Sequence, residues 1–418
     1  MSSNVMARTT TRTPELRRSG GWAAVGVATF STAWGGNQFT PLLVMYRADG
    51  GFSALTADLL LFAYVLGIVP ALLVGGSLSD RFGRRPLMLP APVLAAVGSA
   101  ILVVGGSSAW ALGVGRVFSG LALGLAMAVG GSWIKELSSP PWETAAKGAG
   151  ARRAAMSLTA GFGLGAAVAG ALAEWAPAPT VLPYAVNIAV ALVAWVLLLR
   201  TPDTRTPQRR NCIPAGAHSI FGCWNAISAG TWRRFVRVLV PVAPWVFGAG
   251  ASAYAVLPAL MADHVAGAPV AFSAVLCLVA LGVGFTVQHS ARHWGLDDRT
   301  GVVVALSLVV LGMVLAAWAA AVLTVWAALI AAAMLGAGYG MTLLVGLQQV
   351  ERIAGPDDLA ALTAVFYSLT YLGFAVPAAL AFLSRSLSYP VMFGFGAIAA
   401  VVSLFAAVGG SRRPVPIS

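Results

Sequence analysis

The sequence predicts an all-α multi-pass membrane protein with twelve transmembrane helices, arranged as two pseudo-symmetric six-helix bundles. The prediction rests on composition, on the spacing of the charged residues and on a repeat of that spacing. Of 418 residues, 59% are hydrophobic and 10% are charged, whereas soluble domains are about half apolar and about a quarter charged. A soluble chain of this length would lack the polar residues needed to cover its surface. Composition therefore excludes a cytosolic enzyme, a nucleic-acid-binding protein and a disordered scaffold.

The helices follow from the uncharged runs. A transmembrane helix needs about 20 apolar residues, because the hydrocarbon core is about 30 Å thick and a helix rises about 1.5 Å per residue. Runs long enough for two helices are counted twice, which gives six helices in each half. In the first half the runs are 18–47, 58–80, 85–135 (two helices), 153–174 and 174–200. In the second half they are 237–263, 263–292, 299–351 (two helices), 358–385 and 385–412.

The long polar interruption between the halves defines the domain organisation. Within it, Ile220, Phe221, Trp224 and Ile227 share one helical face, which predicts an amphipathic helix on the membrane surface; the alternative is an unstructured linker. The expected parts are a cytoplasmic tail (1–20), a first bundle (21–200), a cytoplasmic linker (201–232), a second bundle (233–409) and a second cytoplasmic tail (410–418).

The distribution of basic residues accounts for the formal net charge of +12. If the N-terminus is cytoplasmic, Arg47 and Arg385 are the two basic residues on the outside and Arg116 lies within a helix; all others fall inside. Lys and Arg concentrate on the cytoplasmic side of membrane proteins. We therefore expect both termini to be cytoplasmic and read the charge as an orientation signal.

A short charged loop joins the second and third predicted helices. It reads Gly76-Ser77-Leu78-Ser79-Asp80-Arg81-Phe82-Gly83-Arg84-Arg85. We expect Gly76 to allow close packing and Gly83 to permit a tight turn, with Asp80 pairing with a neighbouring helix end or cation. The loop resembles the signature loop of the major facilitator superfamily. That resemblance implies a secondary transporter in which Gly76, Asp80, Arg81, Gly83, Arg84 and Arg85 act in gating.

A fainter copy of this loop stands in the second half. Aligning Gly295 with Gly83 places Arg292 at the position of Asp80 and Trp294 at that of Phe82. Such a copy is expected if both six-helix halves derive from one repeat.

The fourth predicted helix carries a charge within its apolar run. Arg116 precedes Gly120 by four residues, which is similar to the second motif of the superfamily. A membrane-buried guanidinium is costly and is normally paired and functional. We expect Asn37 and Gln38, or backbone carbonyls beside them, to be its partners. A role in coupling is one interpretation; the other is that Arg116 only ties the first helix to the fourth.

The fifth predicted helix is rich in glycine. Gly161, Gly165 and Gly170 resemble the motif of the drug/proton antiporter branch, although Ala166 stands where that motif has a proline. The alternative interpretation is close helix packing alone.

The resemblance also indicates where substrate binds, because the first helix of each three-helix unit lines a central cavity in this superfamily. Aromatic side chains with a few polar groups suit a moderately apolar ligand. The alternative for each aromatic residue is helix packing or an interfacial belt. The expected cavity residues are Trp34, Asn37, Gln38, Trp245, Tyr254, Tyr339, Met341, Tyr367 and Tyr371.

No acidic residue is expected at mid-membrane, although a proton-driven carrier needs a group that gains and loses a proton. Together with Arg116, the candidates for coupling are Asp58, which opens the second helix, and Glu136, which closes the fourth. The alternative for Asp58 is that its charge only stabilises the N-terminus of its own helix.

The expected function is a proton-coupled exporter of small amphipathic compounds or drugs, working by alternating access as an antiporter in multidrug resistance. An importer or uniporter of a specific metabolite is the alternative, and a membrane-embedded enzyme or receptor is a more distant one. No catalytic residues, cofactor, metal or nucleic acid are expected, and His289, His293 and Asp297 are set aside as a metal set because Gly295 should end the helix before Asp297. We expect a monomer in the cell (inner or plasma) membrane, with a small-molecule substrate, protons and the bilayer as partners.

Overall fold

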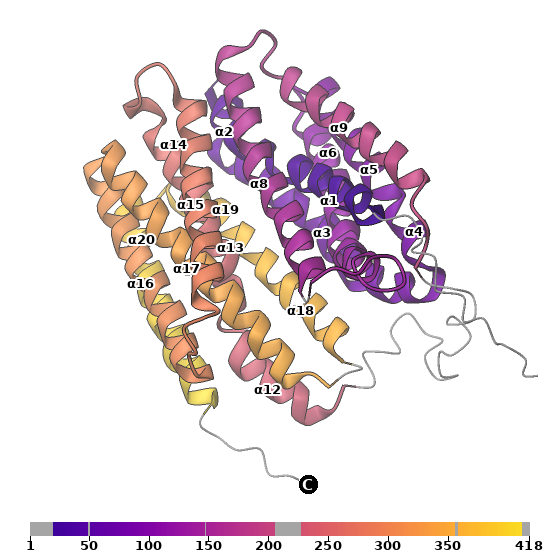
Figure 1. Ribbon diagram of the computed structural model, residues 1–418. Coiled ribbons are helices and arrows are strands. Elements are labelled where there is room, and N and C mark those ends of the chain that lie inside the picture. Colours follow the sequence, from indigo (N-terminus) through magenta and orange to yellow (C-terminus); the bar gives the residue numbers. More distant parts are fainter. Residues whose placement is uncertain (1–19, 49–50, 147, 205–226, 356–357, 412–418) are drawn as a thin grey trace, which may run out of the picture.

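The computed structural model describes residues 20–48, 51–146, 148–204, 227–355 and 358–411, and within these ranges every regular element is a helix (Figure 1). Eleven helices are long and apolar enough to cross a membrane. One further crossing, the first in the chain, brings the number to twelve; it is divided at Gln38 into two shorter helices. The predicted fold class is therefore confirmed. The expected surface helix lies almost wholly outside the described residues.

The first bundle contains six crossings, and two of them are irregular. The first is broken at Gln38, and the fourth contains one π-helical segment. The elements are α1 (Gly21–Asn37) and α2 (Phe39–Ala48); α3 (Ala54–Phe82); α4 (Arg84–Met88) and α5 (Pro90–Val104); α6 (Ala109–Leu125), η1 (Ala126–Gly130) and α7 (Gly131–Leu137); α8 (Ala149–Trp175); and α9 (Leu182–Leu199).

The second bundle also contains six crossings. The seventh includes a π-helical segment and the eleventh a single 3₁₀ turn. The elements are α12 (Ala229–Leu239), α13 (Ala243–Ala251), η3 (Ser252–Val256), α14 (Leu257–Met261) and η4 (Ala262–His264); α15 (Pro269–Ala291); α16 (Asp298–Val322); α17 (Val325–Ile353); α18 (Leu359–Tyr371), η5 (Leu372–Phe374) and α19 (Ala375–Leu383); and α20 (Tyr389–Ser411).

Packing inside the two bundles follows the same plan. Helix α3 packs on α6 as α15 packs on α17, and α5 packs on α9 as α16 packs on α20. Between the bundles, α8 lies against α15, and α3 lies against α18 and α19. One interface pairs the second crossing with the eleventh, and the other pairs the fifth with the eighth. The second and eighth crossings hold the same position in their bundles, as do the fifth and eleventh, so the two interfaces are equivalent, as expected for halves derived from one repeat.

Glycine lets these helices approach each other closely. A Cβ at Gly67 would lie 2.1 Å from the Val117 carbonyl oxygen, so α3 and α6 meet backbone to backbone. A Cβ at Gly340 would lie 2.2 Å from the Gly284 carbonyl oxygen, which gives the same contact between α17 and α15. In lipid, where apolar burial does not favour helix association, such contacts supply much of the packing.

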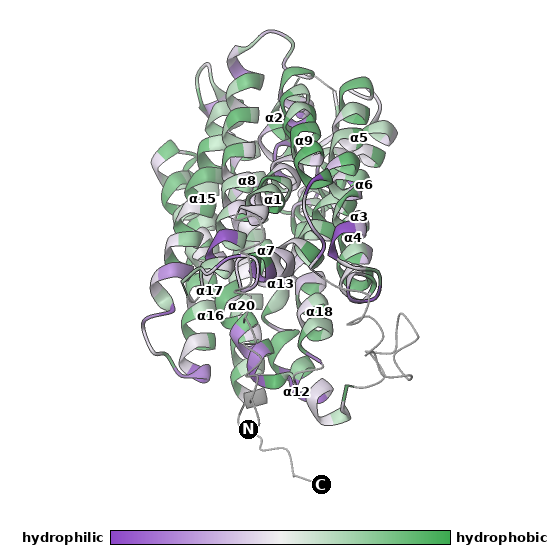
Figure 2. Ribbon diagram, turned by 45° about the vertical axis from the view of Figure 1, so that its right-hand side comes forward, coloured by the Kyte–Doolittle hydropathy of each residue, from purple (hydrophilic) through white to green (hydrophobic). Residues whose placement is uncertain are grey.

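The outer surface fits a bilayer. Hydrophobic residues cover the lengths of the helices, while hydrophilic residues gather near the helix ends (Figure 2). Trp110, Trp175 and Trp326 are strongly exposed and stand where α6 begins, α8 ends and α17 begins. All three belong to the end of the molecule opposite the signature loop, called the far end below. Tryptophan is enriched at membrane interfaces, so these residues mark one membrane boundary.

Candidate functional site

A narrow central cavity lies between the two bundles; the space not filled by atoms at this site is about 390 Å³, which includes space open to solvent. Four crossings of each bundle line it, and none of the described residues lining it is acidic. The lining residues are Gly36, Asn37, Thr40, Tyr64, Arg116, Phe162, Phe247, Tyr254, Leu281, Tyr339, Tyr371 and Phe374.

Breaks in helix geometry position several of these side chains. Asn37 is the last residue of α1 before the break, Tyr254 lies in the π-helical η3, and Phe374 ends the 3₁₀ turn η5. Non-α turns within helices often occur at functional sites. The turn at η5 also brings Gly373 against α13, where a Cβ would lie 2.3 Å from the Gly248 nitrogen.

Arg116 is the charged residue of the cavity, and it is 1% exposed. Its Nη1 donates to the Gly36 carbonyl oxygen at 3.0 Å, and its Nε donates to the Leu60 carbonyl oxygen at 3.4 Å. Its guanidinium lies 4.5 Å from the centre of the Tyr64 ring and 4.8 Å from that of Phe39. The expected backbone partner beside Asn37 is thus present, and both described hydrogen bonds go to uncharged groups.

An aromatic cluster lines the cavity and joins the two bundles. Phe247 stacks on Tyr371 at 4.5 Å and on Phe374 at 4.9 Å between ring centres. Tyr64 of the first bundle meets Tyr371 and Phe374 edge to face, each at 6.2 Å. Tyr339 lies 5.8 Å from Phe247. The cavity is therefore lined mainly by aromatic rings, with one cation among its described lining residues.

Four of the nine expected cavity residues line this space, namely Asn37, Tyr254, Tyr339 and Tyr371. Asn37 also bridges the bundles, because its Nδ2 donates to the Phe162 carbonyl oxygen at 2.9 Å and to Cys277 Sγ at 3.4 Å. Four further aromatic residues line the cavity although the sequence did not indicate them: Tyr64, Phe162, Phe247 and Phe374.

The structure places the other five expected residues elsewhere. Trp34 packs edge to face on Phe30, and Tyr367 packs beside Phe366. Gln38 points into the first bundle and donates to Ser99 Oγ at 3.0 Å. Trp245 donates to Ser403 Oγ at 3.0 Å, and Met341 joins a separate apolar cluster of the second bundle. Trp34 and Tyr367 thus pack on their own helices, whereas Gln38 and Trp245 bond to a neighbouring helix of the same bundle.

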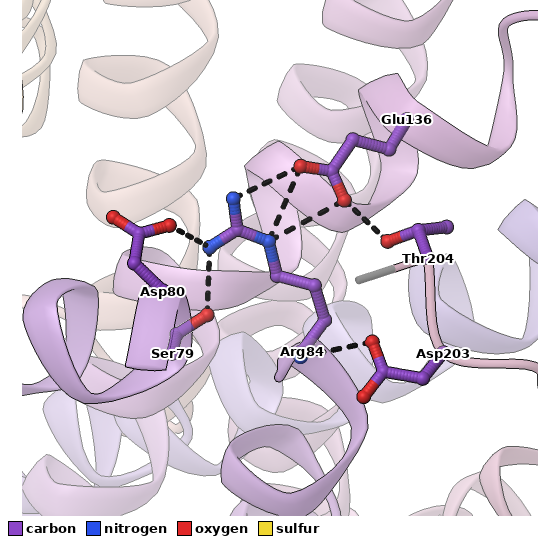
Figure 3. A network of polar contacts seen from close by, with 6 residues as sticks. All are labelled: Ser79, Asp80, Arg84, Glu136, Asp203 and Thr204. Atoms are coloured by element: carbon purple, nitrogen blue, oxygen red, sulfur yellow. Dashed lines mark hydrogen bonds and ion pairs between the residues drawn. The ribbon is translucent and has the colours of Figure 1, made fainter. Parts of the chain in front are cut away.

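The signature loop forms a network around Arg84, whose side chain is nearly buried (Figure 3). The guanidinium pairs with Glu136 at 2.9 Å and with Asp80 at 3.0 Å, and it donates to Ser79 Oγ at 2.7 Å. Its backbone N–H donates to Asp203 Oδ1 at 3.1 Å, and Thr204 donates to Glu136. The network fixes the start of the third crossing to the end of the fourth and to the segment after the sixth.

The two glycines of the loop behave differently. Gly83 has a φ of +105°, a conformation that favours glycine, and it separates α3 from α4 as the expected tight turn. The expected close packing at Gly76 is wrong, because a Cβ there would meet no described atom within 4 Å. Gly76 faces away from the neighbouring helices, and the packing falls instead to glycines nearer the middle of α3, such as Gly67.

The second-half copy keeps the turn and reverses the charges. Gly295, like Gly83, has a positive φ, at +61°. Asp298 at the start of α16 pairs with Arg352 near the end of α17, where the first half has Arg84 and Glu136. Asp297 caps α16, and the hydrogen bonds it accepts from Thr300 lower the pKa of its carboxyl. The ninth and tenth crossings are thus joined as the third and fourth are, with acid and base exchanged.

The remaining coupling candidates already have cationic partners. Asp58 is buried near the far end and pairs with Arg47 at 2.6 Å, whereas Glu136 belongs to the Arg84 network. Neither carboxylate lines the cavity. Asp58 lies one turn into α3, whose N-cap is Ser53, so its observed contact is the ion pair.

The glycines of the fifth helix divide between two interfaces. A Cβ at Gly161 would lie 2.4 Å from the Phe30 carbonyl oxygen and one at Gly165 would lie 2.8 Å from Trp34 Cα, so both pack α8 on α1. A Cβ at Gly170 would lie 2.5 Å from the Ala274 Cβ of α15, across the bundle interface. Beyond it, Glu174 Oε2 accepts from the Val270 and Ala271 backbone N–H groups at 2.7 and 2.9 Å. Close packing at Gly170 and the capped start of α15 therefore hold α8 against α15 at the far end.

Comparison with known proteins supports this architecture. Residues 25–378 match the family model described as Major Facilitator Superfamily. The fold is similar to a mutant of the peptide transporter POT in complex with sulfate (TM-score 0.73, 16% identity, covering 94% of this chain and 95% of that one). It is also similar to the nucleoside transporter NupG (TM-score 0.71, 11% identity, covering 94% and 100%).

Curated relatives match over short segments. Facilitated glucose transporter member 10 of solute carrier family 2 from Homo sapiens is 35% identical over 98 residues, 23% of this chain and 18% of that protein. Inositol transporter 4 from Arabidopsis thaliana is 38% identical over 74 residues, 18% of this chain and 12% of that protein. The chain thus aligns with less than a fifth of the length of either relative.

Proposed function

Because the chain belongs to the major facilitator superfamily, we propose that it is a secondary active transporter that moves its substrate by alternating access through the central cavity. The observation that carries the proposal is a cavity built from both bundles, beside interfaces that pair the second helix with the eleventh and the fifth with the eighth. Rocking of the bundles about such a site opens it to one side and then to the other. The direction of transport is export, and the substrates are small amphipathic compounds that suit the aromatic wall.

Accumulation of a panel of fluorescent dyes and drugs, in cells with and without the protein, tests export. We expect lower accumulation of at least one amphipathic compound and loss of that difference when a protonophore is added. Gly170→Trp, which places a large side chain against Ala274, should abolish the difference. Gly282→Trp is the matched control, because a Cβ at Gly282 meets no described atom within 4 Å. Equal accumulation of every compound would contradict export of such compounds.

Proton coupling is part of the proposal, and the buried Asp58–Arg47 pair supports it as the site. A carboxylate that loses its cationic partner when the bundles move would take up a proton more readily. Substrate-driven pH change is measured for Asp58→Asn, with Asp80→Asn as the comparison at the signature loop. Asp58→Asn should uncouple transport from protons. Full coupling in both variants would rule out both sites.

Import of a specific metabolite is the second candidate. It is favoured by the short matches to the glucose and inositol transporters. Uptake of radiolabelled glucose and myo-inositol into cells that carry the protein distinguishes it from export. Uptake that is saturable and absent from Gly170→Trp would favour import.

The orientation of the protein, with both termini in the cytoplasm, is proposed from the basic residues. The signature-loop end carries Arg81, Arg84 and Arg85, while Arg47 lies at the far end. Single-cysteine variants of Arg81 and Trp175 label with a membrane-impermeant maleimide only from the side they face. Labelling at Trp175 and not at Arg81 in intact cells is the expected result; the reverse pattern would invert the orientation.

A further inference from the structure

The central cavity contains a buried cation without a counter-charge. Arg116 forms no ion pair with any described carboxylate, and its hydrogen bonds go to backbone carbonyl oxygens. The nearby buried acid, Asp58, is held by Arg47. Burial of an uncompensated charge is costly, and rings and carbonyls offset the cost only in part. An anion that enters the cavity would therefore be stabilised where a cation would be repelled.

A polar group that lacks a hydrogen-bond partner lies beside Arg116. The Tyr64 hydroxyl is buried and has no hydrogen-bond partner among the described residues. The same ring carries the Arg116 guanidinium on its face. A Cβ at Gly36 would lie 2.6 Å from this hydroxyl, so the glycine leaves the room that the hydroxyl occupies. A buried tyrosine hydroxyl normally has a partner, and a carboxylate oxygen would accept its hydrogen bond.

The rest of the cavity fixes the shape of the ligand. Phe247, Tyr371 and Phe374 form a stacked wall, and Tyr64 closes its edge. Stacked and edge-to-face contacts favour a planar ring system over a branched or sugar-like ligand. The Asn37 amide already forms hydrogen bonds with Phe162, Cys277 and Thr40. It therefore helps to position the cavity wall and is not needed as a hydrogen-bonding group for the ligand.

We propose that the substrates are aromatic organic anions, whose carboxylate binds Arg116 and the Tyr64 hydroxyl while the ring system lies against Phe247, Tyr371 and Phe374. The proposal rests on the transport function proposed above and deepens it by naming the charge and the shape of the ligand. Lipophilic cations of the same size should bind more weakly, since the described lining holds a positive charge and no carboxylate.

The test is calorimetric titration of the purified full-length protein in nanodiscs with probes that differ in charge. They are 2-naphthoate, 2-naphthamide, 2-naphthylmethylammonium and acetate. A hydrogen-bonded charge pair corresponds to roughly tenfold or more in affinity. We therefore expect naphthoate to bind at least about tenfold more tightly than the amide and the ammonium. Acetate should bind weakly because it lacks a ring.

Three variants locate the binding. Arg116→Met should lower naphthoate affinity by about tenfold or more, and Tyr64→Phe by a few-fold. Arg152→Met, which removes an exposed charge of α8, is the control and should bind as the wild type does. If Arg116→Met does not fold, two measurements still test the anion site: the order of probe affinities on the wild type, and the naphthoate affinity of Tyr64→Phe.

Two results would overturn the proposal: naphthylmethylammonium binding as tightly as naphthoate, or a monodisperse Arg116→Met binding naphthoate as the wild type does. Dye export together with a preference for the cationic probe would refute the anion site and leave the transport function standing. Tight naphthoate binding that depends on Arg116, with no transport of any compound, would support the site and refute the function.

Discussion

The backbone carbonyl of Tyr64 lies against Gly120, where a Cβ would stand 2.1 Å from the carbonyl oxygen. This contact explains why a glycine follows Arg116 by one helical turn. It draws α6 onto α3, so that the guanidinium one turn earlier lies over the Tyr64 ring. The four-residue spacing is therefore a packing requirement that also places a charge in the cavity.

Enlarging Gly120 should separate these two helices. Gly120→Ala adds a Cβ that can be accommodated only by moving backbone, at a cost of about 1–3 kcal/mol. Gly113→Ala on the same helix is the control, because the nearest described atom to its Cβ would be a leucine methyl at 3.7 Å. Thermal unfolding in one detergent compares the variants. A melting temperature for Gly120→Ala equal to that for Gly113→Ala would contradict the close contact.

The Arg84 network should show a graded response. Glu136→Gln leaves a nearly buried guanidinium with one carboxylate, so we expect a loss of about 1–2 kcal/mol. Asp80→Asn removes a half-exposed partner and should cost at most about 1 kcal/mol. Denaturation followed by the fluorescence of the tryptophans gives both values. The order would be reversed if Asp80 were the main partner of Arg84.

The charge-reversed pair of the second half should matter less. The side chains of Arg352 and Asp298 are 52% and 34% exposed, and exposed pairs contribute about 0–1 kcal/mol. Arg352→Gln should therefore change the free energy of unfolding by no more than about 1 kcal/mol. A larger loss than that of Glu136→Gln would show that the second-half pair is the stronger of the two.

The rate at which the Cys277 thiol is labelled measures how tightly the two bundles are packed together. It is fully buried beside Asn37, at the interface of α15 with the first bundle. With Cys212 and Cys223 replaced by serine, N-ethylmaleimide should label it slowly. Labelling should become several-fold faster in Gly170→Trp and stay slow in Gly282→Trp. Equal rates in the two tryptophan variants would mean that parting of the bundles does not expose this thiol.

The sequence predicted the fold because charges mark the ends of apolar helices, and that signal survives without any knowledge of packing. It predicted the cavity only in part. Tyr64 was missed because it lies on the second helix, which reaches the cavity only through its close approach at Gly120. Phe374 was missed because the 3₁₀ turn at η5 reorients the helix, and hydrophobic periodicity does not reveal such a turn.

Trp245 shows the converse error. Its place near mid-membrane on the seventh helix made it a candidate, but Ser403 on the twelfth helix offers a hydrogen bond inside the same bundle. The sequence gives no way to choose between two partners on opposite sides of a helix. The polar cavity residues Asn37 and Arg116 could be identified from the sequence, because an amide or a guanidinium group within an apolar helix needs a hydrogen-bond partner in whichever direction it points.

Distances across both ends of the molecule test alternating access most directly. Spin labels at Trp175 and His264 report the far end, and labels at Arg81 and Arg299 report the signature-loop end; all four side chains are exposed. Gly170→Trp should wedge the far end open, so pulsed electron resonance should show the first distance lengthening and the second shortening together. Gly282→Trp should change neither. Lengthening of both distances in Gly170→Trp, or no change in either, would contradict the alternating movement of the two bundles about the cavity.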